Sequence, residues 1–149
     1  MKRLIYLGTG LAILFLNSLP LFADQEDCSK ATKLVLQAYD MGKNSYSEQK
    51  KLLHEAIRLC PDHPEAHNNL ASILEEEKDY DAALLHYQKA VSARPDFAEA
   101  WFGIGEVYSK TGKSLLALEA YMKGSNDPDA RRKAEEIIRS EKYRFVESG

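Results

Sequence analysis

The sequence predicts an all-α fold of stacked helical hairpins, because it repeats every 34 residues and its apolar residues follow a helical period. Five series of residues recur at this spacing: Pro61 and Pro95; Tyr46 and Tyr80; Ala56, Ala90 and Gly124; Leu53, Tyr87 and Tyr121; Leu36, Leu70 and Ile104. No segment shows the alternating pattern of a half-buried strand. A period of this length is typical of helical hairpins that stack on one another.

Composition and charge are those of an ordinary globular protein. The chain has 149 residues, of which 44% are hydrophobic and 29% are charged, and this length fits one compact domain. Its 20 basic residues are outnumbered by 23 acidic ones, for a net charge of -3. Such a chain has no strong positive field to attract phosphate groups, so we do not expect it to bind nucleic acid.

The N-terminal 23 residues have the pattern of a secretory signal peptide. Lys2 and Arg3 precede an apolar run from Leu4 to Leu16, and Pro20 and Ala23 follow without an acidic residue. This order predicts cleavage after Ala23 and export, with the periplasm as the expected compartment and the extracellular space as an alternative. If the segment is not cleaved, residues 4–23 are just long enough to anchor the protein in a membrane.

Residues 64–129 carry the most regular part of the repeat. One unit reads His67-x2-Leu70-Ala71-x2-Leu74, Ala83-x3-Tyr87, Ala90 and Pro95, and the next reads Trp101-x2-Ile104-Gly105-x2-Tyr108, Ala117-x3-Tyr121 and Gly124. This pattern resembles the tetratricopeptide-repeat (TPR) family. The resemblance implies a right-handed superhelical solenoid over residues 24–129, with hairpins at about 30–63, 64–97 and 98–129. A capping helix and tail would follow at 130–149.

The helices of the second and third units have their own start signals. Asp62 and Asp96 are each followed three residues later by a glutamate, Glu65 or Glu99, which is the pattern of a helix N-cap. We therefore expect the two aspartates to cap the first helices of these hairpins.

The two ends of the array are less regular. In the first unit, Gln37 and Gln49 stand where the resemblance implies larger apolar or small residues, as is common in terminal repeats. After the third unit, residues 130–143 predict one amphipathic helix. We expect its Ile137 and Ile138 to cover the last hairpin.

The sequence contains no motif of an enzyme active site. The nearest string, His54-Glu55, has Arg58 where a second metal-binding histidine would be needed. We therefore expect a noncatalytic protein that needs no cofactor. The alternative is a small metal- or redox-active protein that uses Cys60, His63 and His67. Against that alternative, His67 is expected to pack between helices and His63 to face solvent.

In the family that the chain resembles, the first helix of each hairpin lines a concave binding surface. By this resemblance the groove includes Leu34 and Ala38, and then Glu65, Asn68, Asn69, Ser72, Glu75, Glu99, Phe102, Glu106 and Ser109. The amides and hydroxyls can hydrogen-bond an extended peptide, Phe102 offers an apolar anchor, and the glutamates favour a neutral or basic partner. We expect a scaffold or adaptor of the cell envelope that binds an extended peptide or a partner helix.

Chaperone adaptors of this family hold an acidic C-terminal carboxylate in a clamp of basic and amide side chains. Of that clamp, only Asn69 has a counterpart here, because Leu34, Ala38, Glu99 and Gly103 stand at the other positions. The resemblance therefore does not extend to this kind of ligand. The chain could also be the front part of a longer envelope protein.

Cys28 and Cys60 are the two cysteines of the chain. An even pair in an exported protein is expected to be oxidised. Cys28 precedes the first helix of the first hairpin and Cys60 ends its second helix, and these two ends of a hairpin lie side by side. We predict a disulfide between them; the alternative is two separate thiols, with Cys60 packed as a small apolar side chain.

Overall fold

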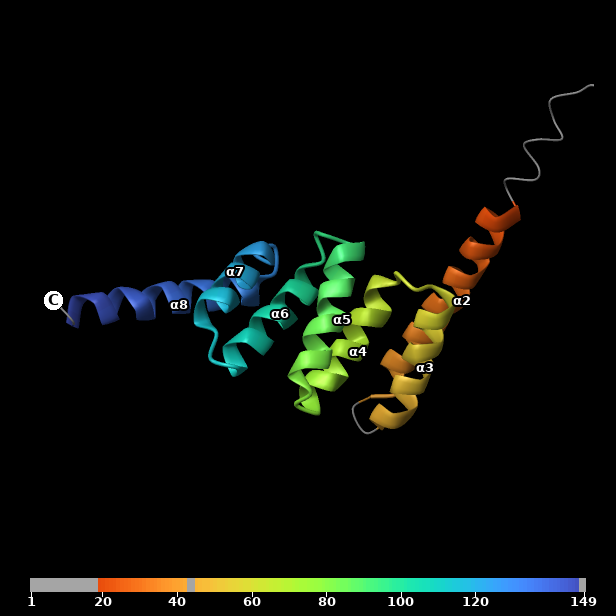
Figure 1. The fold of residues 1–149 in the computed structure, drawn as a ribbon, viewed down its shortest axis with the longest axis horizontal. Coiled ribbons are helices and arrows are strands. Elements are labelled where there is room, and N and C mark those ends of the chain that lie inside the picture. Colours follow the sequence, from red (N-terminus) through yellow and green to blue (C-terminus); the bar gives the residue numbers. More distant parts are fainter. Residues whose placement is uncertain (1–18, 43–44, 148–149) are drawn as a thin grey trace, which may run out of the picture.

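The structure is a row of α-helices in chain order (Figure 1). The computed structural model describes the backbone of residues 19–42 and 45–147 and the side chains of residues 25–42 and 45–140. The helices are α2 (Leu19–Asp40), α3 (Tyr46–Leu59), α4 (Pro64–Glu76), α5 (Tyr80–Ala93), α6 (Ala98–Lys110), α7 (Ser114–Lys123) and α8 (Pro128–Glu147). Within these ranges there is no strand, and no helix is long and apolar enough to cross a membrane.

The helices pair into three hairpins that stack side by side. Helix α2 packs with α3, α4 with α5, and α6 with α7, and each hairpin contacts the next one along the chain. Figure 1 shows the row running from α2 and α3 at one end to α8 at the other. The predicted all-α solenoid of three hairpins and a C-terminal helix is confirmed. It forms because each hairpin has an apolar face that only its neighbour can cover.

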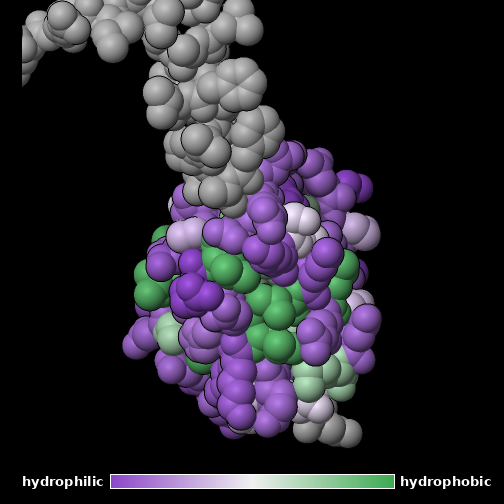
Figure 2. Space-filling model, turned by 90° about the vertical axis from the view of Figure 1, so that its right-hand side faces the viewer, coloured by the Kyte–Doolittle hydropathy of each residue, from purple (hydrophilic) through white to green (hydrophobic). Residues whose placement is uncertain are grey.

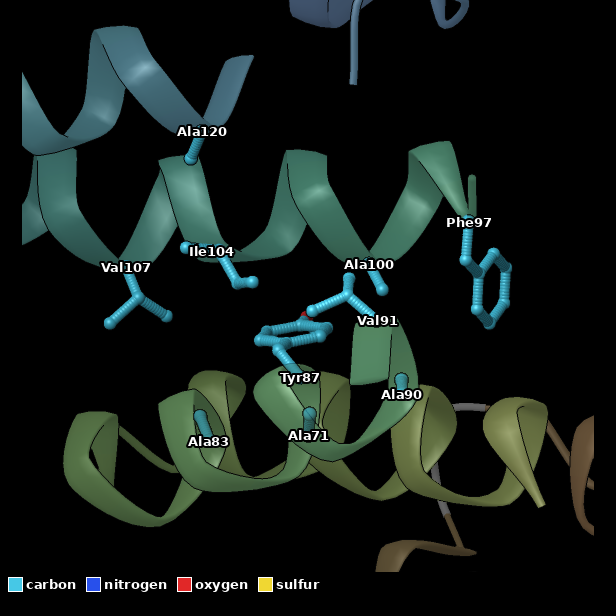
Figure 3. Close-up of a cluster of buried hydrophobic side chains, with 10 residues drawn as sticks. All are labelled: Ala71, Ala83, Tyr87, Ala90, Val91, Phe97, Ala100, Ile104, Val107 and Ala120. Atoms are coloured by element: carbon cyan, nitrogen blue, oxygen red, sulfur yellow. The ribbon is translucent and has the colours of Figure 1, made fainter. Parts of the chain in front are cut away.

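Two buried tyrosines from the second helices of hairpins fill the space against α6. The ring of Tyr87, on α5, lies against Gly103, and the ring of Tyr121, on α7, lies against Gly105. A Cβ atom at either glycine would overlap the ring, so this close approach requires glycine. Figure 3 shows Tyr87 pointing from α5 toward α6, next to Ile104.

The first hairpin differs from the other two in the length of its turn. Residues 41–45 separate α2 from α3, whereas the corresponding turns are residues 77–79 and 111–113. The two extra residues shift α2 along the repeat, so that Leu34, and not Leu36, corresponds to Leu70. Leu34 packs against the first core cluster, while Leu36 is 59% exposed. The predicted register of Leu36 with Leu70 and Ile104 is therefore wrong.

Helix α2 is also longer than the predicted first helix. It begins at Leu19 and runs through the expected cleavage position after Ala23. Residues 1–18, which make up most of the expected signal peptide, lie outside the described residues. Export therefore stays a prediction at this point.

The starts of α4 and α6 correct the predicted caps. The N-cap of α4 is His63, whose Nδ1 accepts a hydrogen bond from the backbone N–H of Ala66 at 3.4 Å. The N-cap of α6 is Phe97, which makes no side-chain capping bond. Asp62 and Asp96 each stand one residue too early to cap. In α4 the reason is Pro64, because proline favours the first helical position and leaves the cap to the residue before it.

Helix α8 covers the last hairpin along one face. Its Ala130 and Ala134 are buried beside Ala117 and Tyr121, and Ile137 packs at the edge of this cluster. Ile138 is instead 53% exposed, so its predicted role in the cover is wrong. One residue along an α-helix turns the side chain by about 100°, which carries Ile138 away from the contact.

Candidate functional site

The first helices of the hairpins each present a stripe of side chains at helical spacing, and we call the three stripes the inner wall. With the shift of α2, its stripe is Thr32, Leu36 and Tyr39. The stripes of α4 and α6 consist of the predicted groove residues, namely Glu65, Asn68, Asn69, Ser72 and Glu75, and Glu99, Phe102, Glu106 and Ser109. Sequence reasoning missed the α2 stripe because it assumed turns of equal length.

Four of the predicted groove residues, Ala38, Asn68, Asn69 and Ser72, line one pocket between α2, α3 and α4. This inner pocket has a volume of about 250 Å³, and its other lining residues are Tyr39, Gly42, Tyr46, Gln49, Leu53, Ile73 and Glu76. The side chain of Tyr39 is 76% exposed, so a ligand can contact it directly. The pocket combines an apolar interior with amide and hydroxyl groups at one side.

The long turn of the first hairpin is fixed beside this pocket by Gln49. Its side chain is buried, and its Nε2 donates a hydrogen bond to the carbonyl oxygen of Gly42 at 2.8 Å. Gly42 has a φ of +69°, in the left-handed region that favours glycine. The glutamine that broke the predicted pattern therefore has a role, which is to hold the start of the turn at Gly42.

The side-chain amide of Asn68 is incompletely paired. Its Oδ1 is buried and accepts no hydrogen bond from any described residue, and its Nδ2 donates a long hydrogen bond to Asn69 Oδ1, at 3.4 Å. A buried acceptor without a donor costs free energy that a bound N–H group would recover. Rotation of this amide into the inner pocket would let it accept a hydrogen bond from a ligand.

A second cavity, of about 480 Å³, lies at the other end of α2, and its lining includes Cys28, Cys60, Leu36, Glu65 and Arg94. The guanidinium of Arg94 forms an ion pair with the carboxylate of Glu65. Glu65 is therefore not a free negative charge on the inner wall.

His63, which was expected to face solvent, is buried beside this second cavity. Its Nε2 lies 3.0 Å from Thr32 Oγ1, and its Nδ1 lies 3.2 Å from the Glu65 carboxylate. Burial lowers the pKa of the imidazole, against the opposing effect of Glu65. The expectation failed because the ring caps α4 and is thereby turned into the space between α2 and α4.

Two further glutamates of the inner wall, Glu75 and Glu106, also have partners. Glu75 binds the Lys110 ammonium at 2.6 Å and accepts a hydrogen bond from the Tyr87 hydroxyl at 2.9 Å. The Tyr121 hydroxyl donates in the same way to Glu106, at 2.5 Å. Burial and these carboxylates raise the pKa of both phenols, so both stay protonated donors. These glutamates join helices to one another and contribute little free charge.

Phe102, the expected apolar anchor, belongs to the C-terminal core. Its ring centroid lies 5.8 Å from that of Tyr121, in the cluster that α8 covers. Glu99 and Ser109 are exposed on the same helix and line neither cavity of the inner wall. Of the predicted groove residues, Ala38, Asn68, Asn69 and Ser72 thus meet at the inner pocket and Glu65 lines the second cavity, whereas Glu75 and the residues of α6 line neither.

Cys28 and Cys60 form the predicted disulfide, with Cα atoms 4.8 Å apart. Because its sulfur is in this bond, Cys60 is not a thiolate ligand for a metal. His63 faces Thr32 and Glu65, and His67 faces away toward α5. Over the residues whose side chains are described, no group of three acidic, histidine or cysteine side chains could hold a metal ion.

His67 is buried between α4 and α5, as expected. Its Nε2 donates to the carbonyl oxygen of Pro61 at 2.8 Å, so its Nδ1 is left to accept from His86 Nδ1, 2.9 Å away. Burial lowers the pKa of both rings, and the neighbouring His67 helps to lower that of His86 to about 4. At neutral pH the pair is uncharged and joins the two helices.

Known proteins contain the same repeat. A family model for the TPR repeat matches residues 73–112, and one for the tetratricopeptide repeat matches residues 52–84. The human protein O-mannosyl-transferase TMTC3 is 34% identical over 93 residues, which are 62% of this chain and 10% of that protein. The chain spans a tenth or less of the length of the curated relatives it matches.

Solved structures share the fold. The first TPR of Spaghetti (RPAP3), bound to the HSP90 peptide SRMEEVD, aligns with a TM-score of 0.68 at 19% identity, over 75% of this chain and 93% of that one. MamA aligns with a TM-score of 0.66 at 23% identity, over 95% of this chain and 89% of that one. At such identities the likeness establishes the architecture alone.

Proposed function

Since the chain is a tetratricopeptide-repeat protein, and therefore a protein-interaction module, we propose that it holds an extended segment of a partner protein in the inner pocket. The observation that carries this proposal is the convergence of Asn68, Asn69 and Ser72 with the exposed ring of Tyr39 on one cavity. Amide and hydroxyl side chains can satisfy the backbone of an extended peptide, which has no internal hydrogen bonds of its own.

The pocket favours an apolar side chain on the bound segment. Its interior includes Ala38, Leu53 and Ile73, and the large apolar side chains of Leu36 and Tyr39 stand exposed on the same side of α2. Figure 2, which views the α2–α3 end of the row, shows hydrophobic side chains gathered in the middle of a hydrophilic face. An apolar anchor between hydrogen-bonding groups is the usual composition of a specific peptide site.

The charges of the wall disfavour an acidic segment. Glu65 and Glu75 are paired with cations, whereas Glu76, at the edge of the pocket, forms no ion pair with any described residue. The remaining charge beside the pocket is thus negative. We propose a neutral or weakly basic partner segment, unlike the acidic peptide SRMEEVD bound by the RPAP3 domain.

We further propose that the protein works in the cell envelope after export. Residues 1–23 have the order of a signal peptide, and a disulfide such as Cys28–Cys60 persists in oxidising compartments. Mass spectrometry of the protein from fractionated cells tests this. We expect a mature N-terminus at Asp24 in the envelope fraction; an intact, reduced chain in the cytosol would contradict export.

A peptide selection tests the inner pocket. The purified oxidised protein is used to select binders from a phage-displayed library of random 12-residue peptides, and their affinities are then measured by fluorescence anisotropy. Tyr39→Ala should weaken them at least tenfold, because it removes an exposed contact without touching the core. Asn68→Leu should weaken them to a similar extent while leaving stability equal or higher, because it removes a buried acceptor that lacks a donor.

The matched control is Leu85→Ala, on α5, which removes another exposed apolar side chain away from the inner wall. Its peptide affinities should equal those of the wild type. Peptides that bind Tyr39→Ala and Asn68→Leu as tightly as the wild type would show that the inner pocket is not the binding site.

A further inference from the structure

A third cavity opens on the side of α6 that faces away from the inner wall. This outer pocket has a volume of about 230 Å³ and lies between α5 and α7, with Trp101, Ile104 and Tyr108 of α6 as its floor. Their spacing places these three side chains on one face of the helix, away from the face that carries Phe102 and Glu106. The proposed binding of a peptide in the inner pocket does not use this surface.

The outer pocket exists because of a small residue at one repeat position. In the second hairpin, His86 of α5 reaches the ring of His67 on α4 and fills the space between them, with ring centroids 5.1 Å apart. The residues 34 positions later are Ala120 and Trp101. Ala120 is too short to fill the equivalent space, so the Trp101 ring is left lining an open cavity.

The Trp101 ring is held in place within this cavity. Its indole N–H donates a hydrogen bond to the carbonyl oxygen of Pro95 at 2.8 Å, and the Lys123 ammonium lies 4.8 Å from the ring centroid. An aromatic side chain fixed at one edge by a hydrogen bond offers a rigid apolar surface, which is typical of binding hot spots.

The rim of the outer pocket is apolar and positively charged. Leu116 lines the pocket and is 44% exposed, and its neighbours on α7, Leu115 and Met122, are also exposed. Lys123 stands over Trp101, and Lys113 lies 5.8 Å from the ring centroid of Tyr108. Glu119 offsets one of these charges through its ion pair with Lys123, so the rim keeps a positive excess.

We propose that the outer pocket binds an amphipathic helix of a partner protein, with an apolar side chain in the cavity and acidic residues flanking it. Three of the polar side chains that line the pocket already have partners, since Trp101 donates to Pro95 and Glu119 pairs with Lys123. Gln88 and Tyr108 remain to serve the backbone of a ligand, so an extended peptide would lose most of its backbone hydration there without compensation. A helix satisfies its own backbone and needs only an apolar face to fit such a groove. Acidic flanks complement the two lysines at the aromatic floor.

The test uses two synthetic 18-residue helical peptides without tryptophan. They share an apolar face of Leu and Phe at helical spacing and differ in their flanking residues, which are Glu in one and Lys in the other. Trp101 is the one tryptophan of the chain, so its fluorescence reports directly on the pocket. We expect the Glu peptide to shift the emission of Trp101 and to bind at least tenfold more tightly than the Lys peptide.

Three variants locate the effect. Leu116→Glu should weaken the Glu peptide more than tenfold, and Lys123→Glu should reverse the preference between the two peptides. Leu36→Glu, on the inner wall, is the control and should leave both affinities unchanged. All three positions are exposed, so each variant is expected to fold, which circular dichroism would check.

Equal affinity for the two peptides, or binding that leaves the emission of Trp101 unchanged, would overturn the proposal. A dimer of the protein in sedimentation velocity that Leu116→Glu converts to monomer would also overturn it, because the occupant would then be a second copy of the chain. These results do not bear on the proposed peptide binding in the inner pocket, because that proposal is tested separately by the peptide affinities of Tyr39→Ala and Asn68→Leu.

Discussion

Removal of the Cys28–Cys60 disulfide should destabilise the first hairpin more than any other part of the molecule. The bond joins residues separated by 32 positions in the sequence. In the chain-entropy account, closing a loop of that size stabilises the folded state by about 3 to 4 kcal/mol. For a protein of this size, such a loss corresponds to a fall in melting temperature of about 6 to 16 °C.

The perturbation is the double variant Cys28→Ser with Cys60→Ser, and the assay is thermal unfolding combined with amide hydrogen exchange. Because each hairpin contacts only its neighbours, faster exchange should be confined largely to α2 and α3, with α6 and α7 nearly unchanged. Dithiothreitol should lower the melting temperature of the wild type and leave that of the variant unaffected. The reasoning would be refuted if the variant had the same melting temperature as the oxidised wild type. It would also be refuted if amide hydrogen exchange became faster by the same factor along the whole chain.

The remaining predictions concern pH and one turn. Burial lowers the folded-state pKa of His86 to about 4, from 6.5. The free energy of unfolding should therefore not depend on the charge of His86 above pH 6.5. Below pH 6.5 the unfolded chain binds a proton at His86 that the folded protein does not. The free energy of unfolding should then fall by at most about 1.4 kcal/mol per pH unit because of His86. His86→Leu should flatten the dependence of the urea midpoint on pH, and an unchanged slope would contradict the assignment. Lys78, at φ 65°, occupies the turn position that Gly112 occupies one repeat later at φ 73°. Lys78→Gly should therefore stabilise by about 0.5 to 1 kcal/mol and Gly112→Ala should destabilise by about 1 kcal/mol, as shifts of the urea midpoint. A lower midpoint for Lys78→Gly would contradict this.

The second and third hairpins could be predicted well because their residues are set by local geometry that repeats. Gly105 is needed where the Tyr121 ring approaches α6 closely, and the turns at 77–79 and 111–113 have equal length. When the turns have equal length, residues that are 34 apart in the sequence occupy equivalent positions in successive hairpins. The disulfide could be predicted because the two helices of a hairpin run side by side. Its position differs in one respect, since Cys28 lies within α2, which begins at Leu19, and not before the first helix.

The first hairpin could not be placed correctly by spacing alone. Two extra turn residues change which side chains of α2 face the core, and nothing in a repeat of 34 marks where an insertion lies. As a result Leu36 and Tyr39, which stand exposed on the inner wall, were missed. Of the two residues predicted instead, Leu34 packs against the core and Ala38 lies in the interior of the inner pocket. Gln49 was the available signal, since a buried glutamine needs a partner such as the backbone of the longer turn.

The candidate sites depend on which side chains of different helices contact one another, and the repeat pattern in the sequence does not specify these contacts. Glu65 and Glu75 look like free acids in the sequence, yet each finds a cation from a later segment, Arg94 or Lys110. The outer pocket depends on the absence of a side chain, since Ala120 stands where the preceding repeat has a histidine. Such features follow from which neighbours meet, and only the structure supplies that.

The most direct measurement of the central claim is photo-crosslinking in the native cells. A benzoylphenylalanine residue is introduced at position 39 on the inner wall and, as a control, at the exposed position 54 on α3. Crosslinked products are then identified at peptide level by mass spectrometry. Binding in the inner pocket predicts one partner protein crosslinked from position 39 through a neutral or weakly basic extended segment, and not from position 54. The same products from both positions, or none from position 39 in cells where the protein is present, would contradict the account.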